Sequence, residues 1–220
     1  MKIKYFGHAC FMITTRNGIK ILFDPYQHGA FDGAVGYKPV KVAPDIVCIS
    51  HTHADHSYID ELEGKPEIIA GEGAKIVGEV AINGIKTYHD KKNGRERGIN
   101  IVYVIQVDGA KIVHCGDLGA PFDDRQATII GTVDFLFVPV GGVFTIDAHE
   151  AYIVTQKLKA KYVFPMHYKT PHIGFPLDPV DKFLSKFPEE SIVKYKENEI
   201  ELLPPNFDDP QKVIVMDYVK

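Results

Sequence analysis

Cysteines, long apolar stretches and basic clusters are all scarce in this 220-residue sequence. The three cysteines, Cys10, Cys48 and Cys115, lie in or beside apolar runs. That usage is typical of buried reduced thiols and excludes a disulfide framework. No segment approaches the roughly 20 apolar residues of a membrane span, and residues 1–5 lack the apolar core of a signal peptide. We therefore expect a cytoplasmic protein with no membrane span.

Positive charge is also limited. Lys and Arg total 25 against 29 Asp and Glu, so the formal net charge is −4 at pH 7. The longest basic run is the pair Lys91-Lys92, which argues against nucleic acid as an obligate partner. The expected partner is a small-molecule substrate, and a homo-oligomer is compatible with this composition. A hydrophobic content of 45% predicts a globular core, and the length suits a single domain over residues 1–220.

What the sequence does contain is a dense group of metal-binding residue types, His51-Thr52-His53-Ala54-Asp55-His56. In an extended segment, His51 and His53 point to the same side and can reach one metal ion. A helix predicted over residues 55–62 would place Asp55 and His56 at its start, facing a second ion. Imidazole and carboxylate ligands without thiolate suit Zn, Mn or Fe(II) at an open catalytic site. The alternative is a polar loop whose histidines coincide by chance.

The chain before this group supports the catalytic interpretation. Residues 45–50 (DIVCIS) form a short, nearly continuous apolar run, which is typical of a strand buried on both faces. Layered α/β proteins place their chemistry just past the carboxyl ends of such strands. The sequence therefore predicts a functional site directly after residue 50.

His-x-His-x-Asp-His after a buried strand resembles the metallo-β-lactamase superfamily. Further motifs of that family follow in its order, Tyr88-His89-Asp90, His114-Cys115-Gly116-Asp117 and Phe164-Pro165-Met166-His167-Tyr168. The N-terminal segments FGHAC (6–10) and ILFDP (21–25) are similar to a subgroup of small metal-dependent hydrolases related to ascorbate-6-phosphate lactonase. The resemblance implies an α/β fold, a four-layer αββα sandwich of two mixed β-sheets flanked by helices.

The same resemblance implies a dinuclear site, with the ligands His51, His53 and His89 for one ion, Asp55, His56 and His167 for the other, and Asp117 bridging. A metal-bound hydroxide would then cleave an ester, lactone or phosphodiester, because coordination lowers the pKa of water toward about 7. Asp55 could also hold the attacking water or transfer its proton. Two Zn ions are expected, and Mn or Fe is compatible with these ligands.

Several residues outside these motifs have two interpretations each. His8 is either a catalytic general acid beside the metals or a buried histidine bonded to a carbonyl. Asp24 either accepts the N–H of a ligand imidazole or shapes the turn before Pro25. Cys115 is either a ligand or, as we favour, a core residue. The cations Arg95, Arg97 and Lys169 either contact a substrate anion or are simply solvated.

Two other functions remain to be weighed against hydrolysis. A diiron redox protein of the same superfamily typically has glutamate at the position of His53 and carries a flavin domain, neither of which this sequence shows. A catalytically silent metal- or partner-binding module would be expected to have lost ligands, and every ligand position is filled here. Metal content and turnover distinguish the module from the hydrolase.

Periodicity and turn residues predict the remaining elements. Strands are expected over 3–6, 11–15, 19–23, 45–50, 67–70, 74–80, 84–88, 99–107, 111–114, 134–138, 161–165, 193–203 and 213–218. Besides the helix over 55–62, helices are expected over 147–160, where Asp147 and Glu150 form a capping box, and over 179–186. Residues 27–44 are rich in Gly and Pro and are expected to form a long loop.

Overall fold

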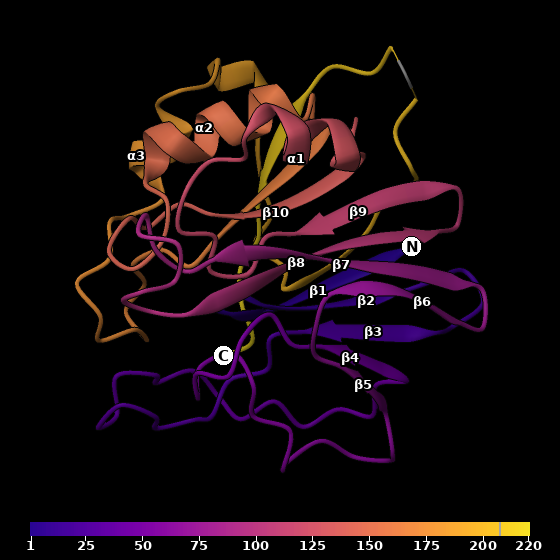
Figure 1. The fold of residues 1–220 in the computed structure, drawn as a ribbon, viewed down its shortest axis with the longest axis vertical. Coiled ribbons are helices and arrows are strands. Elements are labelled where there is room, and N and C mark those ends of the chain that lie inside the picture. The colour runs from indigo at the N-terminus through magenta and orange to yellow at the C-terminus, as the bar shows by residue number, and fades with distance from the viewer. Residues whose placement is uncertain (207) are drawn as a thin grey trace.

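The computed structural model describes residues 1–206 and 208–220 (Figure 1). Its strands are β1 (Lys2–Gly7), β2 (Cys10–Thr14), β3 (Lys20–Phe23), β4 (Ile46–Cys48), β5 (Glu67–Ile69), β6 (Gly73–Val77), β7 (Val80–Tyr88), β8 (Ile99–Val107), β9 (Ala110–His114), β10 (Phe135–Pro139), β11 (Tyr162–Met166), β12 (Ile192–Lys194), β13 (Glu199–Glu201) and β14 (Lys212–Val215). Its helices are α1 (Asp124–Ile130), α2 (Ala148–Lys157), α3 (Asp181–Leu184) and the 3₁₀ turn η1 (Glu189–Ser191).

Over the described residues these strands form two mixed sheets, as expected. The six-stranded sheet has the order β13-β1-β2-β3-β4-β5, and the eight-stranded sheet has the order β12-β14-β11-β10-β9-β8-β7-β6. β1, β2 and β3 pair antiparallel, whereas β3, β4 and β5 pair parallel. In the larger sheet, β6 to β9 are antiparallel and β9, β10, β11, β14 and β12 are parallel. Consequently β7, β9, β10 and β11 all point the same way.

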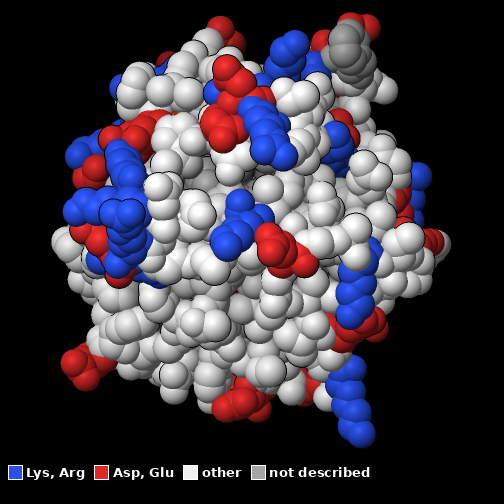
Figure 2. All heavy atoms as spheres, in the orientation of Figure 1, with Lys and Arg blue, Asp and Glu red and all other residues white. Residues whose placement is uncertain are grey.

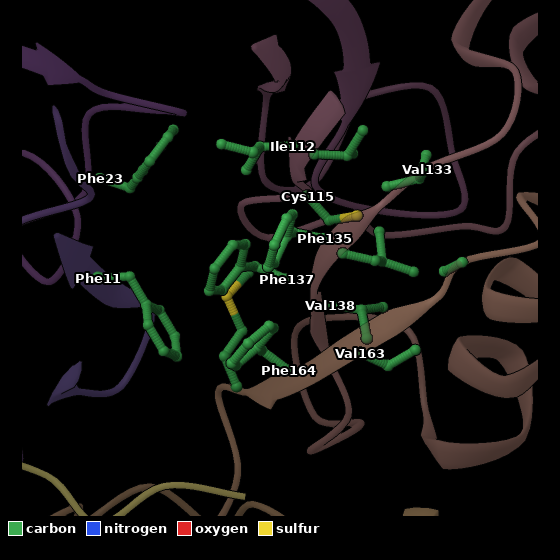
Figure 3. Close-up of a cluster of buried hydrophobic side chains, with 14 of the residues drawn as sticks. Phe11, Phe23, Ile112, Cys115, Val133, Phe135, Phe137, Val138, Val163 and Phe164 are labelled. Carbon is green, nitrogen blue, oxygen red and sulfur yellow. The ribbon is translucent and has the colours of Figure 1, made fainter. Parts of the chain in front are cut away.

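Large aromatic side chains fill the space between the two sheets (Figure 3). Phe11 on β2 packs against Phe137 on β10 with ring centroids 4.6 Å apart, and Phe137 stacks on Phe164 of β11 at 4.7 Å. Each such buried ring contributes about 1.5–3 kcal/mol relative to an exposed one. All five residues of β10 are buried, which is why its sequence is continuously apolar instead of alternating.

The outer faces of the two sheets are covered differently. α1, α2 and α3 lie together on the side of the eight-stranded sheet (Figure 1), and α2 contacts β10. The outer face of the six-stranded sheet is covered by irregular chain, where Leu22 and Val47 pack with Tyr26, Val35 and Val40. The long loop predicted over 27–44 therefore takes the place of a helical layer on that side.

The helix predicted over 147–160 is confirmed as α2. Asp147 accepts hydrogen bonds from the backbone N–H of His149 and Glu150, and the Glu150 side chain accepts one from the Asp147 N–H. α1 was not predicted, although Asp123 and Gln126 form an equivalent capping box that is visible in the sequence.

None of the described helices has the length and hydropathy of a membrane span. In Figure 2, Lys and Arg side chains lie next to Asp and Glu side chains on the upper part and the left side of the face, whereas its lower middle is mostly uncharged.

Four predicted elements differ from the structure in kind or in bounds. Residues 55–62 form turns instead of a helix, because the Tyr58 N–H donates to the Pro25 carbonyl and the Ala54 carbonyl accepts from the Gln27 N–H. The strand predicted over 193–203 is split, since β12 joins the eight-stranded sheet and β13 pairs with β1. The strand predicted over 74–80 turns back after Val77 at Gly78, whose φ is +59°. The helix predicted over 179–186 shortens to α3.

Candidate metal centre

Histidines and aspartates converge at one edge of the sandwich, where strands of both sheets end. His51 to His56 follow β4, His89 follows β7, Asp117 follows β9, and His167 follows β11. Because β7, β9 and β11 run in the same direction, their carboxyl ends deliver these side chains to a common place. The structure thus brings together every metal ligand that the sequence predicted.

The ligand atoms fall into three groups, each spanning no more than 4.8 Å. The groups are His51 with His53 and His89, His56 with His8, Asp55 and His167, and His51 with His56 and Asp117. We call the seven residues His51, His53, Asp55, His56, His89, Asp117 and His167 the ligand cluster. The first two groups correspond to the two predicted ion sites, with His8 added to the second.

Asp117 lies between the two groups. Its Oδ2 is 3.2 Å from Nε2 of His89, 3.3 Å from Nε2 of His56, 3.4 Å from Nε2 of His167 and 3.8 Å from Nε2 of His51. One carboxylate oxygen therefore approaches histidines of both predicted ion sites. This is the position that a bridging ligand requires.

Buried polar atoms without a partner are concentrated here. Among the described residues, the buried side-chain N and O atoms that lack a hydrogen-bond partner are His8 Nδ1, His51 Nε2, His56 Nε2, His89 Nδ1, Asp117 Oδ1 and His167 Nδ1. An unsatisfied buried polar group costs about 1–3 kcal/mol, so such a concentration requires an explanation. Of these atoms, His51 Nε2 and His56 Nε2 lie 3.8 Å and 3.3 Å from Asp117 Oδ2, and such a group of imidazole nitrogens and a carboxylate fits divalent transition-metal ions.

Asp24 fixes the orientation of two of these imidazoles. Its Oδ2 accepts hydrogen bonds from His56 Nδ1 at 3.0 Å and from Ser50 Oγ at 2.7 Å, and its Oδ1 accepts one from the Ser50 N–H at 2.8 Å. Since the Ser50 proton is directed to Asp24, Ser50 Oγ accepts from His51 Nδ1 at 2.9 Å. Both rings thereby donate from Nδ1, which directs Nε2, the nitrogen that can bind a metal ion, toward the centre of the cluster. The structure thus favours the first interpretation of Asp24.

Asn100 was not singled out by sequence and holds Asp117 in place. Its Oδ1 accepts from the Asp117 N–H at 2.9 Å, while its Nδ2 donates to the Cys115 carbonyl and to Thr87 Oγ1. Gly116, with φ of +54°, allows this approach, because a Cβ there would lie 2.4 Å from Asn100 Oδ1. A buried Asn at the start of the apolar β8 was the available signal. Cys115 itself is buried in the core and belongs to none of the ligand groups.

Backbone strain accumulates around the same site. His8, Asp24, Phe31, Phe144 and His167 all have positive φ, between +44° and +81°. Non-glycine residues rarely adopt this region, and each instance costs about 1–3 kcal/mol unless surrounding contacts enforce it. The His167 N–H donates to the His8 carbonyl at 2.9 Å, which links two of these residues. The fold therefore holds the site in a geometry that the local chain does not prefer.

Burial and charge set the protonation of the cluster. Burial lowers the pKa of His51 to about 3. Burial also acts to lower the pKa of His56, but Asp117 and Asp55 outweigh it and hold that pKa well above its ordinary value. Burial raises the pKa of Asp117, yet His167 and His56 outweigh it, so the carboxyl stays ionised. The carboxylates that retain a proton on His56 would equally attract a metal cation.

His8 contacts the second group through Asp55. Its Nε2 lies 3.0 Å from Asp55 Oδ2, and its ring centroid is 4.2 Å from that of His167. Burial lowers the pKa of His8 to about 4. The His8 carbonyl accepts from Tyr5 Oη and from the His167 N–H, whereas no carbonyl among the described residues accepts from its ring. The ring therefore faces the site, as the first interpretation of His8 requires.

Two cavities open onto the ligand cluster. The smaller, of about 170 Å³, is lined by Phe31, His53, Asp55, His89, Arg97, Asp117, Phe144, His167 and Phe175. The larger, of about 400 Å³, is lined by Ile49, Ser50, His51, Thr52, His53, Ala70, Gly71, Glu72, Lys86, Arg97, Gly98, Ile99 and Ile101. We call Phe31, Arg97, Phe144 and Phe175 the mouth. Lys169 is not part of it, because its Nζ donates to the carbonyls of Ile173 and Phe175.

Two stacked mixed sheets with a His/Asp cluster at the strand ends define the metallo-β-lactamase class of fold. A family model described as "Beta-lactamase superfamily domain" matches residues 2–167. The chain therefore belongs to the metallo-β-lactamase superfamily, and within it the chain groups with small metal-dependent hydrolases.

Three relatives place it there. A "UPF0173 metal-dependent hydrolase" of Thermoplasma volcanium is 32% identical over 77% of this chain and 84% of its own length. A protein of the same name from Thermococcus onnurineus is 31% identical over 77% of this chain and 85% of its own. A crystal structure from Thermotoga maritima, assigned to the Zn-dependent hydrolases of this superfamily, is 38% identical with a TM-score of 0.80, covering 98% of this chain and 97% of the other.

Proposed function

We propose that the protein is a dinuclear metal-dependent hydrolase that cleaves an ester, lactone or phosphodiester bond in a small molecule. The observation that carries the proposal is the position of Asp117 Oδ2, within 3.8 Å of histidines from both ion groups. The unpartnered Nε2 atoms of His51 and His56, which lie near it, support the same assignment. Zn is the favoured metal because the ligands are neutral imidazoles and carboxylates, with Mn and Fe as alternatives.

His51, His53 and His89 would hold one ion, Asp55, His56 and His167 the other, and Asp117 both. Such ions supply Lewis acidity, which polarises the scissile group and makes water acidic enough to attack at neutral pH. Asp24 and Ser50 keep the Nε2 lone pairs of His51 and His56 directed at the centre. His8 orients Asp55 through their 3.0 Å contact. Asp55 also lines the smaller cavity, where its carboxylate would accept a proton from the attacking water.

The test is metal content per chain, by elemental analysis of protein purified without a histidine tag, combined with hydrolysis of a chromogenic phosphodiester and a simple lactone. We expect close to two transition-metal ions and turnover that chelation abolishes. Asp117→Asn, which preserves size, should lower the metal content and reduce turnover to background. Asp60→Asn is the control, because Asp60 is exposed and lies near the same motif in sequence but outside the cluster.

Two results would contradict the proposal. Full activity in Asp117→Asn would remove the bridging role. Two bound ions without turnover of any ester, lactone or phosphodiester would instead identify a silent metal-binding module of the same fold.

A further inference from the structure

Arg97 is the only lysine or arginine among the residues that line the smaller cavity, and it also lines the larger one. His53, from the ligand cluster, is the only other residue common to both. The guanidinium therefore stands where the two cavities meet, beside the proposed metal site. A substrate that extends from the metals into the larger cavity has to pass it.

The backbone of Arg97 is held in place by hydrogen bonds within its own turn. Asp90 Oδ2 accepts the N–H of Arg97 at 2.8 Å and that of Glu96 at 3.1 Å, while Asp90 Oδ1 accepts those of Lys92 and Gly94. These four bonds close residues 90–97 into a compact turn. The carboxylate thereby fixes where the Arg97 side chain begins.

The far end of Arg97 is held by an aromatic ring. Its Cζ lies 3.9 Å from the centroid of the Phe144 ring, a close cation–π contact. Phe144 has φ of +81°, and its ring in turn contacts Phe175 with centroids 5.9 Å apart. A bulky aromatic residue in this backbone region is a genuine outlier. Strain of this kind, kept at the rim of a site, is typical of functional positioning.

The positive charge of the Arg97 guanidinium is nevertheless not balanced by an ion pair within the described part of the chain. Among the described residues, no carboxylate forms an ion pair with Arg97, although many other surface cations have one. Guanidinium offers five N–H donors in a planar fork that matches carboxylate and phosphate oxygens. An unpaired, preorganised guanidinium that faces a cavity is suited to bind an oxyanion.

We propose that Arg97 determines specificity by binding a carboxylate or phosphate group of the substrate that is not the scissile group. This deepens the proposed hydrolase function and rests on it. The scissile bond lies in the smaller cavity between Phe31, Phe175 and the ligand cluster. The remainder of the substrate extends past Arg97 toward Ile99 and Lys86 in the larger cavity. The protein therefore prefers anionic esters or lactones to neutral ones of the same length.

The test compares chromogenic esters that differ in charge. The 4-nitrophenyl monoester of glutaric acid carries a free carboxylate, the corresponding ester of 3-phosphonopropionic acid carries a phosphonate, and 4-nitrophenyl butyrate is neutral. We expect Arg97→Gln to lower kcat/KM for at least one anionic ester about tenfold or more, mainly through KM, because the variant loses charge-assisted hydrogen bonds to the oxyanion. Turnover of the butyrate should change less than about twofold. The more affected anionic ester identifies the preferred oxyanion.

Two further variants separate binding from packing. Arg97→Lys keeps the charge but loses the planar fork and the stacking on Phe144, so it should restore only part of the preference. Arg95→Gln is the matched control, since Arg95 lies in the same turn and lines neither cavity; it should retain wild-type discrimination. An equal loss on anionic and neutral esters in Arg97→Gln, or no loss on any, overturns the proposal.

A binding measurement distinguishes failure of this proposal from failure of the hydrolase function. Glutaranilic acid and its neutral counterpart butyranilide are titrated calorimetrically into the metal-loaded wild type and Arg97→Gln. Tighter binding of the acid by the wild type, lost in the variant, supports the role of Arg97 even if no ester is cleaved. Equal binding of glutaranilic acid and butyranilide by the wild type overturns the proposed role of Arg97, whatever the hydrolytic activity.

Discussion

The ligand cluster and the mouth face the same small cavity, but they are built from different parts of the chain. Six of the seven cluster residues are buried, His53 is half-buried, and each follows a strand. In the mouth, Phe31 is 50% exposed, Arg97 is also exposed, and all four residues lie on irregular chain. The fold thus combines a buried, polar ligand cluster with a more exposed mouth built from loops and lined by three aromatic rings. The proposed function assigns the chemistry to the ligand cluster and the choice of substrate to the mouth.

The largest effect that tests this division is a loss of metal affinity at the ligand cluster. Asp24→Asn removes the charge that holds His56 Nδ1 and Ser50, so His56 loses its fixed protonation state. Loss of such a supporting carboxylate typically lowers metal affinity about 10–100-fold. Competition with a chromogenic chelator measures that affinity. The relative turnover of charged and neutral esters should stay as in the wild type, because the mouth is untouched.

Asp45→Asn is the matched control for Asp24→Asn. Asp45 is exposed, and its Oδ2 accepts the Lys20 N–H at the opposite end of the same parallel strand pair. The metal affinity of the Asp45→Asn variant should equal that of the wild type. If Asp24→Asn also binds metal as tightly as the wild type, the hydrogen bonds from His56 and Ser50 to Asp24 are not what orients the ligand cluster for metal binding.

The same division explains what the sequence could predict. The residues His51 to His56 lie within one short segment that the residue pattern alone singles out. His89, Asp117 and His167 were predicted from the order of motifs in the family that the sequence resembles, and the structure places them beside that segment, although metal binding itself stays a prediction. The mouth has no local pattern, since Phe31, Phe144 and Phe175 come from three loops that only the tertiary fold brings together. Arg97 stood among three candidate cations, and sequence gave no means to separate it from Arg95 or Lys169. Asn100 was missed because its role depends on the pairing of β8 with β9.

Errors in the predicted fold have a similar origin. The helix predicted over 55–62 had suitable residues, but the backbone of that segment bonds to Pro25 and Gln27 across the fold. The strand predicted over 193–203 contains the polar residues 196–198, where the chain bends, and its two ends belong to different sheets. In both cases a long-range partner outweighed a local preference.

A smaller effect is expected from the strained backbone of the mouth. At φ of +81°, glycine is tolerated and alanine is not, so Phe144→Gly should be more stable than Phe144→Ala by about 1 kcal/mol in urea unfolding. At the neighbouring Val143, which is 41% exposed and has no positive φ, the order should reverse. If Phe144→Ala is instead more stable than Phe144→Gly, the backbone at residue 144 of the mouth carries no such strain. Both Phe144 variants should also weaken discrimination between charged and neutral esters, because Arg97 loses its stacking partner.

The smallest effect concerns the turn that carries Arg97, and it depends on pH. Desolvation acts to raise the pKa of Asp90, but the backbone N–H groups of Arg97, Lys92, Glu96 and Gly94 outweigh it and lower that pKa to about 2. A carboxyl whose pKa is lower in the folded protein than its ordinary 3.8 stabilises the fold above pH 3.8, and loses that contribution as the pH falls through 2. The stability difference between wild type and Asp90→Asn in urea should therefore be full at pH 5 to 7, and should shrink when unfolding is measured at pH 3. Asp60→Asn, at an exposed position outside this turn, is the control. A difference that stays constant down to pH 2 would mean that the charge of Asp90 does not hold the turn, and that Arg97 is positioned by its contact with Phe144 alone.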